Sequence, residues 1–142
     1  MAIESAKAQD LGPICVLLDS ASLPHEDLSE ASLQQFLAAR LDNHIVGVVG
    51  LECYEDVALL RSLVVAKAHS GFGIGKQLVA AAEELAAETG IKSLYLLTTS
   101  ADRFFAGLGF RRLQRELAPQ PIKSTSQFSS LCPATAVLMS KP

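Results

Sequence analysis

The sequence has few of the features that mark a secreted, membrane-spanning or zinc-binding protein. Its three cysteines, Cys15, Cys53 and Cys132, show no CxxC spacing, so neither a disulfide framework nor a zinc site is indicated. The N-terminus lacks the basic start and the apolar run of a signal peptide. The longest apolar stretch, residues 45–51, is too short to cross a bilayer. We therefore expect a cytoplasmic protein that binds no membrane.

Basic residues are also in the minority. The chain of 142 residues carries 12 Lys and Arg against 15 Asp and Glu, which gives a formal net charge of −3. Such a surface does not attract polyanions, so we expect no nucleic-acid partner. Hydrophobic residues, by contrast, make up 49% of the chain and charged residues 19%, which excludes a disordered chain. Residues 1–142 are expected to form a single domain with one core.

The spacing of apolar residues predicts helices and strands in mixed order. Short turns in the first half of the chain predict antiparallel hairpins, and the longer strands are apolar on both faces, so the sheet should be covered on both sides. The polar stretch 118–133 is expected to be a loop. Helices are expected at residues 10–20 with Asp10 as N-cap, 28–36, 75–89 and 101–107, and strands at residues 3–5, 36–41, 45–53, 57–65, 93–97, 110–117 and 134–139.

The most informative segment is residues 61–86, RSLVVAKAHSGFGIGKQLVAAAEELA, in which a buried strand runs through a glycine-rich turn into a helix. We call residues 70–76 the glycine loop. Gly71, Gly73 and Gly75 let the backbone bend tightly and let a ligand approach the main chain. The helix start adds N–H groups and the positive end of the helix dipole, a combination that binds phosphate or diphosphate. The alternative is that the glycines only shape a tight turn.

Two other phosphate-binding loops do not fit this segment. A P-loop needs a glycine five residues before the Gly75-Lys76 pair and a Ser or Thr after it, but Ser70 and Gln77 stand at those positions. The dinucleotide-binding pattern GxGxxG would need a glycine in place of Lys76. Both patterns therefore fail here.

The segment resembles motif A of the GCN5-related N-acetyltransferases (GNAT), whose loop reads Arg/Gln-x-x-Gly-x-Gly/Ala around the diphosphate of coenzyme A. Gly73 and Gly75 match this pattern, while Ser70 stands where Arg or Gln is usual. A later segment, ADRFFAGLGF, resembles the A-x-x-F-Y-x-x-L-G-F of the family. The resemblance implies an acetyl-CoA-dependent N-acetyltransferase. It also implies an α/β (α+β) fold, with a mixed, mostly antiparallel sheet of about seven strands and helices on both faces.

The resemblance assigns roles to particular residues. Backbone groups of Leu63 and Val65 are expected to be catalytic, because an amide donor to the thioester carbonyl oxygen is worth about 10²–10³ in rate. The frequent Tyr of the family, which protonates the leaving thiolate, falls at Phe105, and a phenyl ring cannot donate a proton. Cys132 and Tyr95 are candidates for that role, or they are only packing residues; otherwise solvent serves as the acid or the thiolate leaves unprotonated. Coenzyme A is expected to bind Leu63, Val64, Val65, Ser70, Gly71, Phe72, Gly73, Ile74, Gly75, Lys76, Thr98 and Phe105.

Other segments resemble two narrower groups. LPHEDL, ALLRSLVV, LYLLTTSADRFFAGLGF and FSSLCPATAVLM look like the arsenic-resistance-associated N-acetyltransferases of bacteria. A weaker similarity, in the LTT and in Phe105, points to the acetyltransferase domain of N-acetylglutamate synthases. A single thiol is a poor arsenic(III) site, so any link to arsenic is expected to be indirect, and no metal site is expected.

The acceptor is expected to be a small-molecule amine, either a glutamate-like amino acid or a toxic analogue of it. Arg61 lies two residues before Leu63, so in a regular strand both side chains face the acetyl group, where a guanidinium can grip a carboxylate. Alternatively, Arg61 forms a structural ion pair with Glu52 or Asp56 across the hairpin. Glu52 itself is either a base or that partner. Lys123 and Ser130, on the stretch expected to cover the acceptor, offer a cation and a hydroxyl group.

Other functions stay open at this point. The missing Tyr is compatible with a non-catalytic acyl-CoA-binding module that senses rather than reacts. A protein N-acetyltransferase is a further alternative, although the long stretch 118–133 argues against an open peptide groove. His25 lies in the loop 21–27, which often forms one wall of the acceptor site in this family, or it has no role. The protein is expected to be a monomer or a homodimer.

Overall fold

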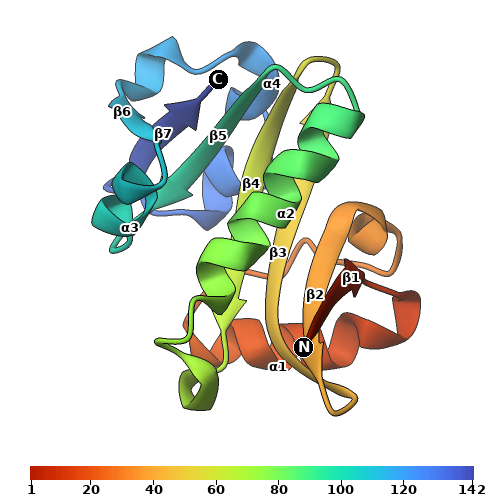
Figure 1. Ribbon diagram of the computed structural model, residues 1–142. Coiled ribbons are helices and arrows are strands. Elements are labelled where there is room, and N and C mark those ends of the chain that lie inside the picture. The colour runs from red at the N-terminus through yellow and green to blue at the C-terminus, as the bar shows by residue number, and fades with distance from the viewer. The chain divides into compact units, whose positions relative to one another are not determined.

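Seven strands form one sheet in the order β1-β2-β3-β4-β5-β7-β6 (Figure 1). The computed structural model describes all residues, 1–142, and their contacts define two units. Unit 1 comprises Met1–Leu51 and Arg61–Leu85, and unit 2 comprises Glu52–Leu60 and Ala86–Pro142. The strands are β1 (Ala2–Ser5), β2 (Phe36–Leu41), β3 (His44–Tyr54), β4 (Val57–Val65), β5 (Ser93–Thr98), β6 (Arg111–Leu113) and β7 (Val137–Lys141), and the helices are α1 (Leu11–Ser20), α2 (Ile74–Glu88), α3 (Asp102–Gly107) and α4 (Gln120–Lys123).

The sheet is mixed and mostly antiparallel, which confirms the predicted fold class. In unit 1, β1 pairs with β2 and β2 with β3, all antiparallel, and a register shift lies between Ala39 and Arg40. The β2–β3 turn uses Asp42 and Asn43, whose φ angles of 51° and 64° are those of a tight hairpin turn. In unit 2, β5 pairs antiparallel with β7 and β7 with β6, while β4 and β5 run parallel. That parallel pair matches the predicted strand–helix–strand order.

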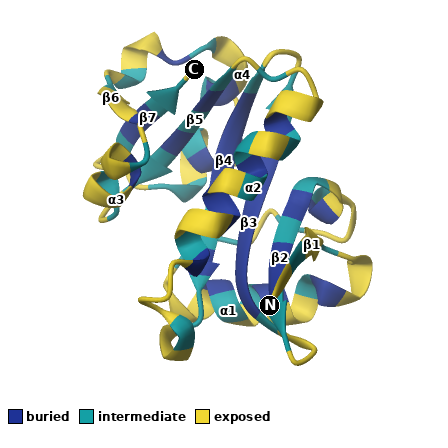
Figure 2. Ribbon diagram, viewed as in Figure 1, coloured by how far each residue is buried: buried dark blue, intermediate teal, exposed yellow.

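Helices cover both faces of β3 within unit 1. On one face, α1 inserts its fully buried residues Ile14 and Leu18 into a core shared with Phe36, Val48 and Val64. Helix α2 lies on the other face. It comes so close to Gly47 that a Cβ atom there would stand only 2.9 Å from Leu78 Cδ1 and 3.4 Å from Ile74 Cγ2. Most of β3 is accordingly buried (Figure 2).

The core cluster of unit 2 has fewer buried residues than the cluster of unit 1 described above, and most of them come from the C-terminal third of the chain. Its buried members are Leu59 of β4, Leu138 of β7, and Ala118 and Ile122 from the segment that follows β6. Tyr95 packs against this cluster, as expected of a residue with a packing role. None of the helices in either unit is both long and apolar enough to cross a membrane.

Asp10 occupies the predicted N-cap position of α1 but does not use its side chain to cap that helix. Its carboxylate instead accepts the N–H of Lys7 at 2.7 Å and the guanidinium of Arg40, which also binds Glu4 at 2.6 Å. Burial acts to raise the pKa of Asp10, but the hydrogen bonds and charges of Arg40 and Lys7 together outweigh it and hold the pKa below its ordinary value. Asp10 and Arg40 therefore form an ion pair whose carboxylate is buried.

Residues 28–36 do not form the predicted helix. They contain only the 3₁₀ turn Ala31–Gln35, and Phe36 already belongs to β2, where it pairs with Gly50. A side chain as large as that of Phe36 gains more from burial in the sheet than from one further helical turn. Tertiary packing therefore overrides the local pattern at this point.

The C-terminal third also differs from prediction. The strand expected at residues 110–117 is limited to β6, because the chain turns into the 3₁₀ turn Arg115–Leu117. The stretch 118–133 is not a simple loop. It contains α4, which Pro119 and Pro121 start, and the π-helical turn Gln127–Leu131.

Gly50 should not tolerate a side chain. A Cβ atom there would lie 2.3 Å from Cζ of the fully buried Phe36 ring, so Gly50→Ala is expected to lower the free energy of unfolding by about 1–3 kcal/mol. Gly12→Ala is the control, because a Cβ at Gly12 in α1 meets nothing within 4 Å and should raise stability by about 0.5–1 kcal/mol. Urea denaturation measures both, and equal effects of the two substitutions would contradict the contact.

Candidate active site

The glycine loop has the backbone that the sequence predicts for an anion-binding turn. Gly71 and Gly73 have φ angles of 86° and 79°, in the left-handed region that favours glycine. The first hydrogen bond of α2 runs from the N–H of Gln77 to the carbonyl of Gly73 at 3.1 Å. The N–H groups of residues 74–76 precede this bond, so they have no acceptor within the helix. They lie at the positive end of the helix dipole, where an anion is stabilised.

The space in front of this loop is open. A Cβ atom on Gly71 or Gly73 would meet no atom within 4 Å, and the ring of Phe72 between them is 75% exposed. Ser70, where the family usually has Arg or Gln, donates its hydroxyl to the carbonyl of Lys67 at 2.8 Å. Backbone amides are therefore the main anion-binding groups that this loop offers.

Strand β4, which precedes the glycine loop in the chain, carries an irregularity at Ser62. Ser62 has a φ angle of 60°, which is unusual for a residue other than glycine within a strand. Val64 is buried in the core that contains Phe36, and Arg61 lies with its guanidinium carbon 5.9 Å from the centroid of the same ring. Arg61 and Val64 are three positions apart, yet both reach the face of β4 that packs on Phe36. The alternation of side chains between the two faces of the strand therefore shifts at Ser62. The expectation that Arg61 and Leu63 share a face is wrong for this reason.

Arg61 forms hydrogen bonds with two residues of unit 1, Ser62 and Asp27. The residue is only 5% exposed, its Nε donates to Ser62 Oγ at 2.9 Å, and its two terminal nitrogens donate to Asp27 at 2.5 and 2.8 Å. A salt bridge was an alternative from the sequence, but Asp27 was not among the partners considered. An acceptor carboxylate could bind this guanidinium only by displacing Asp27, so the geometry does not support the anion clamp.

The loop 21–27 is held by two ion pairs. Burial acts to raise the pKa of Asp27, but the hydrogen bonds and charge of Arg61 outweigh it and keep that pKa below its ordinary value. His25 Nε2 lies 2.6 Å from a carboxylate oxygen of Asp19 in α1. His25 therefore has a structural partner rather than none.

In unit 2, Thr98 and Phe105 have structural contacts. Thr98 Oγ1 accepts the N–H of Ala101 at 2.9 Å and so shapes the entry to α3. Phe105 is 5% exposed and stacks edge-to-face with Phe104 and Phe110, with centroids 5.1 and 5.6 Å apart. The ring at the usual Tyr position is thus part of a packed aromatic cluster.

The segment 118–133 holds three predicted residues. Lys123 ends α4 and is half-buried, and Ser130 donates its hydroxyl to the carbonyl of Ser126 at 3.2 Å. The thiol of Cys132 donates to Oε1 of Gln127 at 3.1 Å. Gln127 is 6% exposed, and its Nε2 has no hydrogen-bond partner. This buried amide beside Cys132 was not found from the sequence, which gives no local signal for it.

Glu52, the other acidic candidate, accepts the hydroxyl of Tyr54 at 2.7 Å, and both residues are half-buried in unit 2. This contact neither requires nor excludes a role as a base, so the role of Glu52 stays a prediction.

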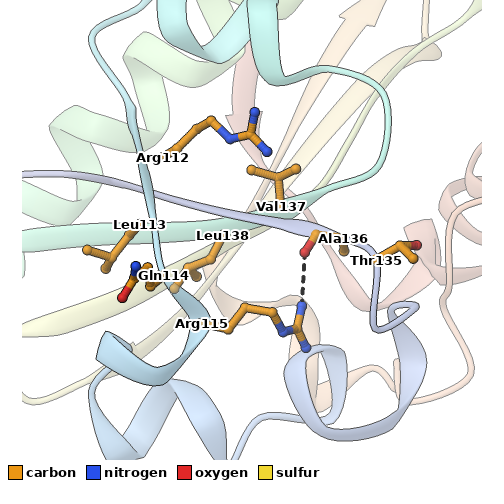
Figure 3. A pocket seen from close by; sticks show the side chains of 8 residues that line it. All are labelled: Arg112, Leu113, Gln114, Arg115, Thr135, Ala136, Val137 and Leu138. Atoms are coloured by element: carbon orange, nitrogen blue, oxygen red, sulfur yellow. Dashed lines mark hydrogen bonds between the residues drawn. The ribbon is translucent and has the colours of Figure 1, made fainter.

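A shallow pocket of about 360 Å³ lies between β6 and the start of β7 (Figure 3). Arg115 on one side donates to the carbonyl oxygens of Ala136 at 3.0 Å and Phe128 at 3.4 Å, and its guanidinium stacks 4.5 Å from the Phe128 ring. Its charge thus serves to hold the chain before β7. The pocket is lined by Arg112, Leu113, Gln114, Arg115, Thr135, Ala136, Val137 and Leu138.

Sequence comparisons identify a family and a relative. Residues 32–112, more than half of the chain, match the family of acetyltransferase (GNAT) domains. An uncharacterized N-acetyltransferase of Chlorobaculum tepidum is 30% identical over 91 residues, which cover 63% of this chain. The match spans 58% of the length of that relative.

Solved structures of similar fold include enzymes with different acceptors. N-acetylglutamate synthase of Neisseria gonorrhoeae, complexed with coenzyme A and N-acetyl-glutamate, gives a TM-score of 0.86 at 20% identity, covering 99% of this chain and 34% of that one. Rv2747 of Mycobacterium tuberculosis, complexed with CoA, gives 0.84 at 21% identity, with 99% and 98% covered. Naa50 of Arabidopsis thaliana, complexed with the bisubstrate analogue CoA-Ac-MVNAL, gives 0.73 at 13% identity, with 99% and 97% covered. These likenesses show the shared fold.

His25 should titrate above the ordinary pKa of histidine. The hydrogen bond to Asp19 raises its pKa more than burial lowers it. The stabilisation by this pair is therefore complete below the ordinary value of about 6.5 and is lost as pH rises through the raised pKa. In an NMR titration, Asp19→Asn is expected to lower the pKa of His25. Identical titration curves in the two proteins would contradict the ion pair.

Proposed function

Because the chain belongs to the family of GNAT acetyltransferase domains, we propose that it transfers the acetyl group of acetyl-CoA to the amino group of a small acceptor. The relative from Chlorobaculum tepidum is named an N-acetyltransferase, and two of the structural neighbours were solved with coenzyme A. The chain spans 58% of that relative and 34% of the Neisseria synthase, so the proposal concerns the catalytic domain alone.

The glycine loop is the observation that carries this proposal. Two glycines with positive φ, an open space before them and the amides of residues 74–76 form a site for a diphosphate, which is the anionic centre of coenzyme A. The same features do not suit a P-loop or a dinucleotide site, because the required glycines are missing. In this proposal, Gly71, Gly73 and Gly75 make the closest backbone approach, and Ser70, Phe72, Ile74 and Lys76 complete the loop.

Catalysis in this proposal consists of positioning and of hydrogen bonding to the reacting carbonyl. Acetyl-CoA supplies an activated thioester, which a deprotonated amine can attack directly. Backbone groups of Leu63 and Val65 orient the acetyl group, and an N–H in this stretch donates to the carbonyl oxygen as negative charge develops. The side chain of Val64 packs in the core, so in this proposal the backbone groups of Leu63 and Val65 contact the acetyl group.

The proton for the leaving sulfur cannot come from Phe105. Its buried, stacked ring has no donor, so in this proposal it contributes shape, and Thr98 shapes the turn before it. Cys132 is the proposed acid. Its thiol proton is directed at the amide oxygen of Gln127, 3.1 Å away, so the proton has a defined position.

The proposed acceptor is a glutamate-like amino acid or a toxic analogue of it, including an arsenic-bearing one. The link to arsenic resistance would then be indirect, in the sense that the protein acetylates an amino group and does not bind arsenic through a thiol. The support is the Neisseria synthase complex with N-acetyl-glutamate, together with Lys123 as a cation and Ser130 as a hydroxyl group on the segment 118–133. The hydroxyl oxygen of Ser130 keeps acceptor capacity for an ammonium group. Glu52 is the proposed base for that ammonium. A monomer or homodimer would suffice for this chemistry.

A peptide acceptor is the second candidate, because Naa50, solved with a peptide-containing analogue, shares the fold. The acceptor panel below distinguishes the two. A chain that binds coenzyme A tightly but releases no thiol with any acceptor would instead be the acyl-CoA-binding module.

Coenzyme A binding should depend on Gly73. Gly73→Ala and Gly90→Ala place Ala at φ angles of 79° and 84°, so each should cost about 1–2 kcal/mol of stability. Only Gly73→Ala should weaken coenzyme A binding, by about tenfold or more, or about 1.4 kcal/mol, because Gly90 lies at the other end of α2. Calorimetry that gives the same affinity for both variants would contradict the assignment of the glycine loop.

Thiol release from acetyl-CoA should be fastest with small anionic amino acids. In a panel of glutamate, neutral amines, polyamines and peptides, glutamate-like compounds are expected to give the highest kcat/KM, rising with pH as the amine loses its proton. Lys123→Ala should raise the KM for such acceptors by the equivalent of about 1.5–3 kcal/mol, while the exposed Lys92→Ala serves as control. Higher rates with peptides or polyamines would overturn the acceptor assignment.

A further inference from the structure

Asp27, Arg61 and Ser62 form a connected set of hydrogen bonds, which we call the Arg61 network. Its three recorded contacts are Arg61 Nε to Ser62 Oγ at 2.9 Å and the two bonds from the guanidinium to Asp27 at 2.5 and 2.8 Å. A guanidinium that binds one carboxylate through two nitrogens is fixed in both distance and direction. The Arg61 side chain therefore has little freedom to rotate.

Ser62, the last member of the network, has the most unusual backbone conformation in β4. Ser62 adopts a φ angle of 60°, a conformation that costs free energy for any residue with a Cβ atom and persists only where its surroundings enforce it. The peptide group that follows Ser62 carries the N–H of Leu63. The conformation of Ser62 thus fixes the direction in which this N–H points.

Packing against Phe36 further restricts the Arg61 side chain. Arg61 lies near the ring of Phe36, which is fully buried against Gly50. Removing a guanidinium from water is costly unless it is paired, so the buried Arg61 requires a partner such as Asp27. The loop 21–27 is tied to β4 by this requirement.

We propose that the Arg61 network is a positioning device for the transfer reaction: it holds Ser62 in its strained conformation and thereby aims the N–H of Leu63 at the acetyl carbonyl. This inference rests on the proposed function and adds three residues to it. None of the three touches the reacting atoms. Asp27 and Arg61 act through Ser62, and Ser62 acts through the peptide group of Leu63.

The test compares two carboxylates of unit 1 that each pair with an arginine. Asp27→Asn weakens the pair with the buried Arg61, and Asp10→Asn weakens the pair between the buried Asp10 and Arg40, which lies outside β4. Both variants should lose stability. Only Asp27→Asn should lower kcat, by about tenfold or more as expected for a misplaced donor, while the Kd of coenzyme A changes less than twofold.

Ser62 provides a second pair of variants. Ser62→Ala removes the hydroxyl and keeps the strain, whereas Ser62→Gly removes the hydroxyl and relieves the strain. Both should lower kcat like Asp27→Asn, although Ser62→Gly should be the more stable of the two. A structural role alone would predict that activity follows stability, with Ser62→Gly the more active variant.

The amide resonance of Leu63 gives a readout that is independent of turnover. It should shift in Asp27→Asn and Ser62→Ala and stay in place in Asp10→Asn. An unchanged Leu63 resonance, or a kcat of Asp27→Asn equal to that of Asp10→Asn, overturns the network's positioning role. A wild type that binds coenzyme A but releases no thiol contradicts the proposed function instead, and the Leu63 resonance then still decides the inference.

Discussion

The close contacts that β3 makes on both of its faces constrain the packing of unit 1. Gly47 admits Leu78 and Ile74 of α2 on one face, and Gly50 admits the ring of Phe36 on the other. A Cβ atom at these positions would displace Leu78 Cδ1 or the Phe36 ring, because distances below 3 Å cannot be accommodated without movement. With α2 held this close, its first turn forms the end of the glycine loop, and the N–H groups of that turn become available to a ligand.

Buried charge is the second constraint, and it limits what the candidate site can recognise. Unit 1 contains two arginine–aspartate pairs with one buried member each, Arg40 with the buried Asp10 and the buried Arg61 with Asp27. Each carboxylate offsets the cost of removing a guanidinium from water, so neither arginine is available to bind an anionic acceptor without loss. The glycine loop of the same unit offers backbone amides, rather than paired arginines, to an anionic ligand.

Much of the fold could be predicted because its signals are local. The predicted bounds of β2 and β4 are those of the structure, and the start of α2 differs by one residue. Alternation of apolar residues and the glycines of the turn act over a few positions, so a window of the sequence contains them. The segment 118–133 was misassigned because its helical turns are short and depend on packing of Ile122 and Ala118 into the core.

The sequence by itself determined the fold class, the glycine loop and the family to which the domain belongs. Each of these is written in residues that are neighbours along the chain, or in patterns that repeat with the period of a helix or strand. Only the tertiary structure decided that Arg61 binds Asp27, that Ser62 has a positive φ angle and that Gln127 lies beside Cys132. An ion pair between residues 34 positions apart, or a strained serine, has no local signature, because its cost is offset by contacts that exist only after the chain has packed.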